Sequence, residues 1–234
     1  FKYLFAALKS IFRQEFKNFK ILIIYDDEDK SDLYKIEKFI KSSKVRKGIS
    51  IQIIINKISL GAGYARNIGI KKSKTKYIAF LDSDDLWTKN KLKTQIEFME
   101  KNKLLFSHSS YFVIDSNNKI LSTREAKPLI TYNQLMRSCD IGLSTVVLNL
   151  NFIKKNNFYF PNIQTKEDYV LWLKILKRIK VVRGIKKKLS YYRKTNNSLS
   201  SNKLRSLING YKVYKNYMRF SLIKSLYYLF VSSN

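Results

Sequence analysis

Two groups of carboxylates stand out in this chain, because each directly follows a short apolar run. Residues 26–29 (DDED) follow the run FKILIIY, and Asp82, Asp84 and Asp85 follow the run YIAFL. These two groups hold seven of the 17 acidic residues of the chain. Carboxylates so close together repel one another, and a bound divalent cation relieves that repulsion. The pattern therefore indicates a cation or substrate site rather than a scattered acidic surface.

Asp82 and Asp84 could face one ligand together. They lie two residues apart, and in an extended chain such side chains point to the same side. Carboxylate oxygens suit Mn²⁺ or Mg²⁺, which take one or two protein carboxylates and complete their shell with water and substrate phosphates. The spacing is therefore compatible with a diphosphate-binding site with Mn²⁺ or Mg²⁺ as cofactor. The alternative is structural, because Asp84 or Asp85 could cap the helix expected after them.

The segment 61–69 (GAGYARNIG) is a second candidate and could hold an anion. Gly61 and Gly63 would let the backbone approach a ligand closely, and a helix that starts near Tyr64 would offer free N–H groups. Arg66 adds a fixed, forked positive charge. The spacing matches neither a dinucleotide-binding fingerprint nor a phosphate-binding P-loop. A tight turn that carries a surface arginine is the alternative.

Strands and helices alternate in the first hundred residues and should bring these candidates together. Short apolar runs predict the strands, and apolar residues at helical spacing predict the helices. The expected strands cover residues 19–25, 49–55 and 77–81, and the expected helices cover the first dozen residues, 33–40, 64–72 and 89–102. The alternation is typical of an α/β fold, Rossmann-like, with a mixed but mainly parallel sheet flanked by helices. Since parallel strands end at one shared edge, both acidic groups should meet there.

The pattern loosens in the second half of the chain. It predicts strands at 104–114 and 141–150, a helix that opens at Glu167 and Asp168, and a basic, aromatic helical tail after residue 203. The tail interleaves tyrosines with lysines and could lie on an anionic membrane surface. A terminal helix packed on the domain is the alternative.

Composition limits the remaining possibilities. The formal net charge is +29, so an anionic partner is expected, although a composition bias is an equal explanation for the many lysines. A single cysteine, Cys139, and a single histidine, His108, exclude an intramolecular disulfide and a Cys/His zinc site, which indicates a reducing compartment. No apolar run is long enough to span a bilayer as a helix.

Taken in chain order, four segments resemble the family 2 glycosyltransferases, inverting sugar transferases of the GT-A fold. They are Asp26-Asp27, the segment 61–69, the run YIAFLDSDD at 77–85, and Glu167-Asp168 before YVLWL. The resemblance spans residues 1–195, a GT-A domain, and leaves 196–234 as the helical tail. The family opens with a central strand, whereas this sequence begins at Phe1 in a helix. The resemblance therefore implies an N-terminally truncated domain with a gap in its sheet.

The resemblance also implies a role for each matching residue. The nucleotide-binding set would be Asp26, Asp27, Arg66 and Asp82, with the acidic pair on the base and the last aspartate near the ribose. Asp84 would ligate the metal on the diphosphate. Asp168 would be the catalytic general base that takes the proton of the acceptor hydroxyl.

The expected activity is transfer of a sugar from a nucleotide-diphosphate sugar to a hydroxyl of a glycan or lipid-linked acceptor, with inversion and metal assistance. It would take place in the cytoplasm or at the inner face of the plasma membrane, in the synthesis of cell-envelope polysaccharide. One alternative is a truncated homologue that binds the nucleotide sugar without turnover. A basic nucleic-acid-binding module is the other alternative, but no recognisable motif of that class is present, so no nucleic acid is expected.

Overall fold

Helices and strands alternate in the first half of the chain, as predicted. The computed structural model describes residues 2–195 and 203–233. The elements of the first half are α1 (Lys2–Phe12), β1 (Phe19–Tyr25), α2 (Leu33–Ser42), β2 (Ile49–Ile55), α3 (Ala62–Lys72), β3 (Tyr77–Ala79), β4 (Leu86–Trp87) and α4 (Lys91–Lys101). Strand β3 ends two residues earlier than predicted.

The second half carries the longer strands and the most deeply buried helix. Its elements are β5 (Phe106–Ile114), β6 (Ile120–Arg124), β7 (Leu129–Thr131), α5 (Tyr132–Leu135), the 3₁₀ helix η1 (Leu143–Thr145), β8 (Val147–Asn149), α6 (Leu150–Lys155), α7 (Glu167–Ile179), β9 (Val181–Arg193), α8 (Lys203–Lys212), the π-helical turn η3 (Val213–Tyr217) and α9 (Leu222–Ser233). The prediction of a strand over 141–150 is wrong for the first half of this segment, which contains η1 instead. There the Thr145 hydroxyl donates to the carbonyl of Gly142 at 2.6 Å, a local bond that competes with extended chain.

The strands form two sheets. Parallel β1 and β2 make the smaller one, with Phe19 opposite Ile49. The larger one has the order β3-β8-β5-β9-β4, with β6 added on β5 and β7 on β9. Among the described residues, two strand pairings are parallel (β1 with β2, β5 with β9) and five are antiparallel. The α/β fold class is confirmed, but the expectation of a mainly parallel sheet is wrong. Helical crossovers make parallel pairs, whereas short connections such as the turn between β5 and β6 make antiparallel ones.

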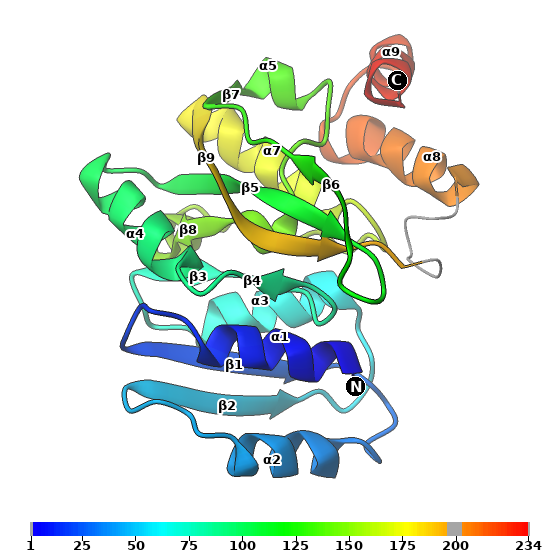
Figure 1. The fold of residues 1–234 in the computed structure, drawn as a ribbon. Coiled ribbons are helices and arrows are strands. Elements are labelled where there is room, and N and C mark those ends of the chain that lie inside the picture. Colours follow the sequence, from blue (N-terminus) through cyan, green and yellow to red (C-terminus); the bar gives the residue numbers. More distant parts are fainter. Residues whose placement is uncertain (1, 196–202, 234) are drawn as a thin grey trace.

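A slot separates β1 from β3. Within the described part of the chain, β1 pairs only with β2, and β3 pairs only with β8. Two cavities of about 320 and 410 Å³ lie between them, and both are lined by Lys20 and Leu22 of β1 and by Tyr77 and Ala79 of β3. Figure 1 shows β1 and β2 as a layer apart from the larger sheet. The two facing strand edges are therefore left without backbone partners in the described residues.

Helix α7 is the centre of the core. Its residues 169–173 are at most 2% exposed, and Trp172 is fully buried. The Trp172 ring packs on Phe106 and Phe160, with ring centroids 5.1 and 6.1 Å apart. Because most of the side chains of α7 are buried, the helix cannot shift without opening the core. The first turn of α7, with Glu167 and Asp168, is therefore held rigidly.

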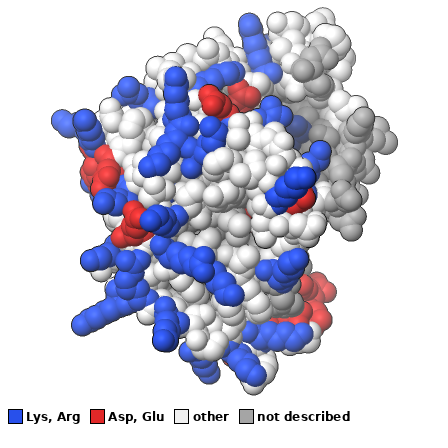
Figure 2. All heavy atoms as spheres, in the orientation of Figure 1, with Lys and Arg blue, Asp and Glu red and all other residues white. Residues whose placement is uncertain are grey.

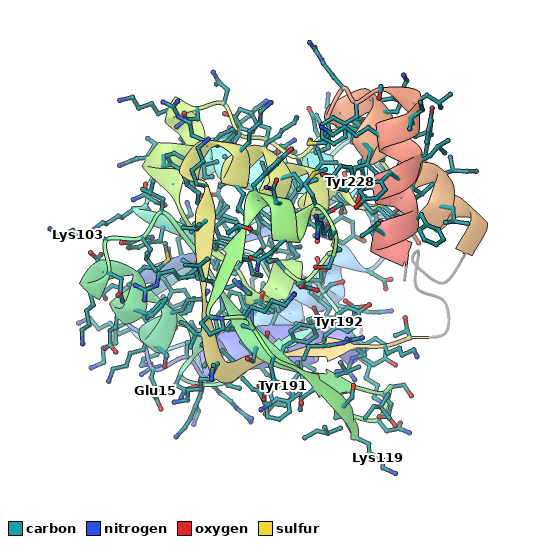
Figure 3. All side chains as sticks on the ribbon, turned by 90° about the horizontal axis from the view of Figure 1, so that it is seen from above. Glu15, Lys103, Lys119, Tyr191, Tyr192 and Tyr228 are labelled. Carbon is teal, nitrogen blue, oxygen red and sulfur yellow. The ribbon has the colours of Figure 1, made fainter. Side chains whose placement is uncertain are left out.

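The tail packs against α7 through η3. Val213 and Tyr214 are buried, and the hydroxyls of Tyr214 and Tyr169 are 3.0 Å apart. Lys and Arg side chains are spread over the face shown in Figure 2, whereas Asp and Glu form a few small groups. Figure 3 shows α8 and α9 at one end of the molecule, with Tyr228 on α9. In the described residues, no helix is both long and apolar enough to cross a membrane.

Candidate active site

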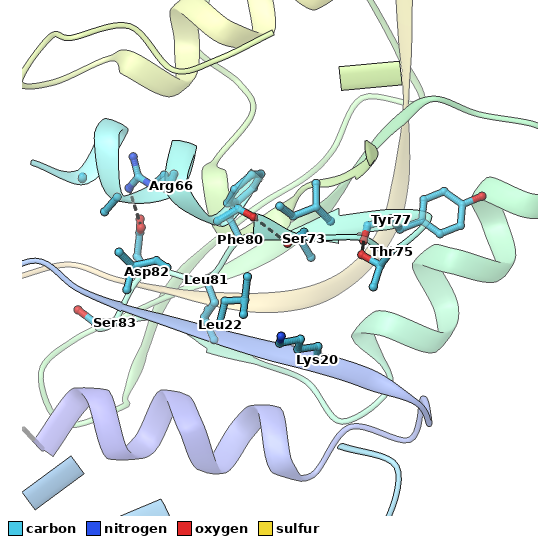
Figure 4. Close-up of a pocket in the computed structure, with 16 residues that line it drawn as sticks. Lys20, Leu22, Arg66, Ser73, Thr75, Tyr77, Phe80, Leu81, Asp82 and Ser83 are labelled. Atoms are coloured by element: carbon cyan, nitrogen blue, oxygen red, sulfur yellow. Dashed lines mark hydrogen bonds and ion pairs between the residues drawn. The ribbon is translucent and has the colours of Figure 1, made fainter. Parts of the chain in front are cut away.

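Arg66 joins three of the four motifs found in the sequence. From α3, its Nη2 donates a hydrogen bond to Oδ1 of Asp82 at 2.8 Å, and its Nη1 donates to Oε1 of Glu167. The Arg66 side chain is only 16% exposed, and that of Glu167 only 11%. Figure 4 shows Arg66 reaching from α3 to Asp82 at one end of the slot. Although burial by itself lowers the pKa of Arg66, the two carboxylates raise it above its ordinary value, so the guanidinium stays charged.

Asp168 lies beside this ion-pair network, in the first turn of α7. The turn begins after Lys166, which has a left-handed φ of 66°. One carboxylate oxygen of Asp168 accepts a hydrogen bond from the backbone N–H of Tyr169 at 2.7 Å. Burial and the neighbouring Glu167 raise the pKa of Asp168 to about 6, against the opposing effect of Arg66. A carboxylate with a pKa close to neutral is a better proton acceptor than an ordinary aspartate, and this suits a general base.

Asp26 and Asp27 follow β1, as predicted, but the structure uses them differently. The Asp26 carboxylate accepts hydrogen bonds from Asn56 Nδ2 at 2.6 Å and from the backbone N–H groups of Leu60 and Gly61 at 3.1 and 2.7 Å. It therefore fixes the loop that leads into α3 and Arg66. Asp27 is exposed, and its carboxylate accepts a local hydrogen bond from the Asp29 backbone N–H at 3.1 Å. The structure links Asp26 to the network through α3 and leaves the Asp27 carboxylate open to solvent.

Asp85 is the buried member of the second acidic group. It accepts hydrogen bonds from the Ser144 hydroxyl at 2.6 Å and from the Arg193 backbone N–H at 2.8 Å. Burial, followed by the charge of Asp82, raises the pKa of Asp85 to about 8. Helix α4 begins at Lys91 with Asn90 as its N-cap residue, so the expectation that Asp84 or Asp85 caps this helix is wrong.

Asp84 is the residue of this group that the resemblance predicts to be the metal ligand. Burial and the charge of Asp82 both raise the pKa of Asp84, so its negative charge is poorly compensated. Within residues 2–195 and 203–233, no three His, Cys, Asp or Glu side chains come together to hold a metal on their own. A Mn²⁺ or Mg²⁺ ion at Asp84 would therefore be bound by one or two carboxylates, with substrate phosphates and water as the other ligands.

Sequence reasoning missed the partners of these residues. Glu167 was part of a motif, but nothing in its spacing indicated an ion pair with Arg66, 101 positions away. Arg193 holds the acidic loop through its Nε, which donates to the carbonyl of Asp84 at 2.8 Å. Ser144 binds Asp85 from the segment that was predicted to be a strand. A buried carboxylate requires donors, but the sequence did not indicate that Asp85 is buried.

Comparison with known proteins identifies the family to which this chain belongs. The family model for glycosyl transferase family 2 matches residues 1–160. The Escherichia coli protein WfgD, named as a UDP-Glc:alpha-D-GlcNAc-diphosphoundecaprenol beta-1,3-glucosyltransferase, is 37% identical over 96% of this chain and 84% of its own length. WfaP, also from E. coli and named for the same reaction, is 39% identical over 91% of this chain and 80% of its own length. The chain therefore belongs to glycosyl transferase family 2, and it is a glycosyltransferase.

A solved structure confirms the fold. The crystal structure of S. aureus TarS, residues 1–349, in complex with UDP-GlcNAc matches with a TM-score of 0.73 at 19% identity. The match covers 97% of this chain and 67% of that one. The GT-A fold predicted from the resemblance is thus confirmed.

Proposed function

We propose that this protein transfers a hexose from a nucleoside-diphosphate sugar to a hydroxyl of a lipid-linked glycan, with inversion at the anomeric carbon. The observation that carries the proposal is the Arg66 network, which sets Asp168, with a pKa of about 6, beside Asp82. The names of WfgD and WfaP support UDP-glucose as donor and a GlcNAc residue on an undecaprenol diphosphate as acceptor. Such a reaction belongs to the synthesis of cell-envelope polysaccharide.

In the proposed mechanism Asp168 removes the proton of the acceptor hydroxyl. The freed oxygen attacks the anomeric carbon while the bond to the diphosphate breaks on the opposite face. A single displacement of this kind inverts the configuration and needs no covalent enzyme intermediate. Arg66 fixes Asp82 near the donor, and the exposed Asp27 meets the base. Asp84 would hold Mn²⁺ or Mg²⁺, whose positive charge would neutralise the departing diphosphate.

The slot between β1 and β3 supports a second candidate, a homologue that binds the nucleotide sugar without turnover. We infer that a further strand belongs in this slot in the active domain, because two facing edges there lack backbone partners in the described residues. We also propose, as a separate point, that the chain divides into a domain over 1–195 and a tail over 196–234. If the slot is open in this chain, hydrogen exchange of the β1 and β3 amides will be faster than that of β5. Equal protection in all three strands would contradict the inference.

Thermal shifts with candidate donors test the proposed function. Saturation at one hundred times the dissociation constant adds about 2.7 kcal/mol, which raises the melting temperature of a chain of this size by roughly 5–10 °C. We expect this rise with UDP-glucose and Mn²⁺, and a much smaller one with GDP, CMP or dTDP sugars. Asp84→Asn should remove the dependence on Mn²⁺, whereas Asp168→Asn should keep it. No rise with any donor, in a folded sample, would contradict the proposal, and a rise without transfer would favour the second candidate.

A further inference from the structure

Helix α9 exposes an apolar stripe on the side that faces away from the core. The stripe consists of Leu222 (54% exposed), Ile223 (82%), Leu226 (50%), Tyr227 (52%) and Phe230 (69%). These positions follow the spacing i, i+1, i+4, i+5, i+8, which places them along one side of a helix. Leu207 and Ile208 of α8, which contacts α9, are also exposed, at 45% and 48%. We call these seven side chains the tail patch.

The tail patch is not the face that attaches α9 to the protein. The inward face is formed by Ser225, which is fully buried, and by Tyr228 and Leu229, which pack against the core. Tyr228 stacks on Tyr214 with ring centroids 5.6 Å apart. Since the inward face is already apolar and packed, the outward face adds nothing to folding. Contiguous exposed apolar side chains of this kind mark an interaction site.

The charge of the tail indicates that the partner of the tail patch is anionic. After Asp168 the sequence contains 16 Lys and Arg residues and no Asp or Glu. Lys212, Lys215, Arg219 and Lys224 are exposed on η3, α9 and the residues beside them. An apolar stripe on a tail segment that carries exposed cations and no Asp or Glu fits the headgroup region of a bilayer that carries anionic lipids, where the apolar side chains enter the acyl boundary and the cations meet phosphates.

We propose that the tail patch docks the protein onto an anionic lipid surface, with α9 lying in the plane of the membrane. The tail adjoins the candidate active site, because Asn209 Nδ2 donates to the Thr165 hydroxyl at 2.8 Å and Tyr214 contacts Tyr169. Docking therefore holds the first turn of α7 close to the lipid surface. The claim that docking helps to capture a lipid-linked acceptor rests on the proposed function. The claim that the tail patch docks on a lipid surface does not depend on it.

Flotation with vesicles tests the docking. The intact chain is mixed with vesicles of phosphatidylcholine alone or with 30% phosphatidylglycerol, at about 0.1 M salt, where charges remain attractive over roughly 10 Å. We expect binding to the anionic vesicles, at least about tenfold weaker binding to the neutral ones, and a similar loss in Ile223→Glu and Phe230→Glu. Tyr34→Glu is the matched control, since Tyr34 is 68% exposed on α2, outside the tail. Melting temperatures and the donor-induced thermal shift should be the same in all variants.

Two results would overturn the proposal. One is equal flotation of the tail variants and the wild type. The other is an absence of vesicle binding together with self-association that Ile223→Glu abolishes, which would make the tail patch an interface between copies of this chain. If the proposed function fails, the wild type transfers no sugar but still floats. If docking alone fails, transfer to a short, water-soluble acceptor remains while flotation is absent.

Discussion

Replacing Arg66 with alanine should destabilise the protein strongly, because Arg66 compensates a buried carboxylate. The Glu167 side chain is 11% exposed and pairs with Arg66, whereas Asp82 is 38% exposed and can be solvated by water. Removing one partner of a buried ion pair costs about 3–5 kcal/mol, and most of that cost is the charge left behind. For a chain of this length the melting temperature should fall by roughly 10 °C.

Urea denaturation of four variants separates this effect from simple loss of packing. Arg66→Ala should show the full loss, and the double variant Arg66→Ala/Glu167→Gln should recover much of it, since no buried charge remains. Arg66→Lys should be intermediate, because an ammonium cannot make both bonds of the guanidinium fork. Arg124→Ala is the control at an exposed arginine of β6, with a change within about 0.5 kcal/mol. A loss below about 1 kcal/mol in Arg66→Ala, or additive losses in the double variant, would refute the reasoning.

Three further predictions concern the aspartates. Because burial and Glu167 raise the pKa of Asp168 to about 6, kcat/KM should increase with pH with a midpoint near 6, and a midpoint near 4 would show that the base is an ordinary exposed carboxylate. Asp84→Asn should lose transfer with little change in melting temperature, and activity at the wild-type level across a Mn²⁺ titration would argue against its role as a ligand. The pKa of Asp85 is about 8 in the folded protein and about 3.9 in the unfolded chain, so between these values the folded state binds the extra proton. The free energy of unfolding should then decrease as pH increases, by at most about 1.4 kcal/mol per pH unit, and Asp85→Asn should flatten this slope in urea titrations from pH 5 to 8.

Local sequence patterns predicted the first half of the fold well. The strands at Phe19–Tyr25 and Ile49–Ile55 have the predicted bounds, because a short apolar run flanked by polar segments is typical of a buried strand. The helix that carries Arg66 and the helix that opens at Glu167 were also predicted. The strand predicted over 141–150 was wrong in its first half, because the Thr145 hydroxyl bonds locally there. The mainly parallel sheet was wrong because the direction of strand pairing depends on the connections between strands, which the strand sequences do not encode.

The candidate site was predicted residue by residue but not as a network. Each acidic group and Arg66 carried a local signal, and the structure brings Arg66, Asp82 and Glu167 into contact. The pairing across 101 positions and the donors from Ser144 and Arg193 depend on tertiary packing, which no local spacing encodes. The structural use of Asp26, which holds the loop before α3, was not visible for the same reason.

The central claim is that Asp168 is the base of an inverting sugar transfer. The most direct measurement incubates the protein with UDP-glucose, Mn²⁺ and a GlcNAc-diphosphate carried on a short alkyl chain, and determines the product and its anomeric configuration by mass spectrometry and NMR. We predict a β-linked product from the α-linked donor, and no product above background from Asp168→Asn although it still binds UDP-glucose. An α-linked product, or transfer by Asp168→Asn at the wild-type rate, would contradict this account.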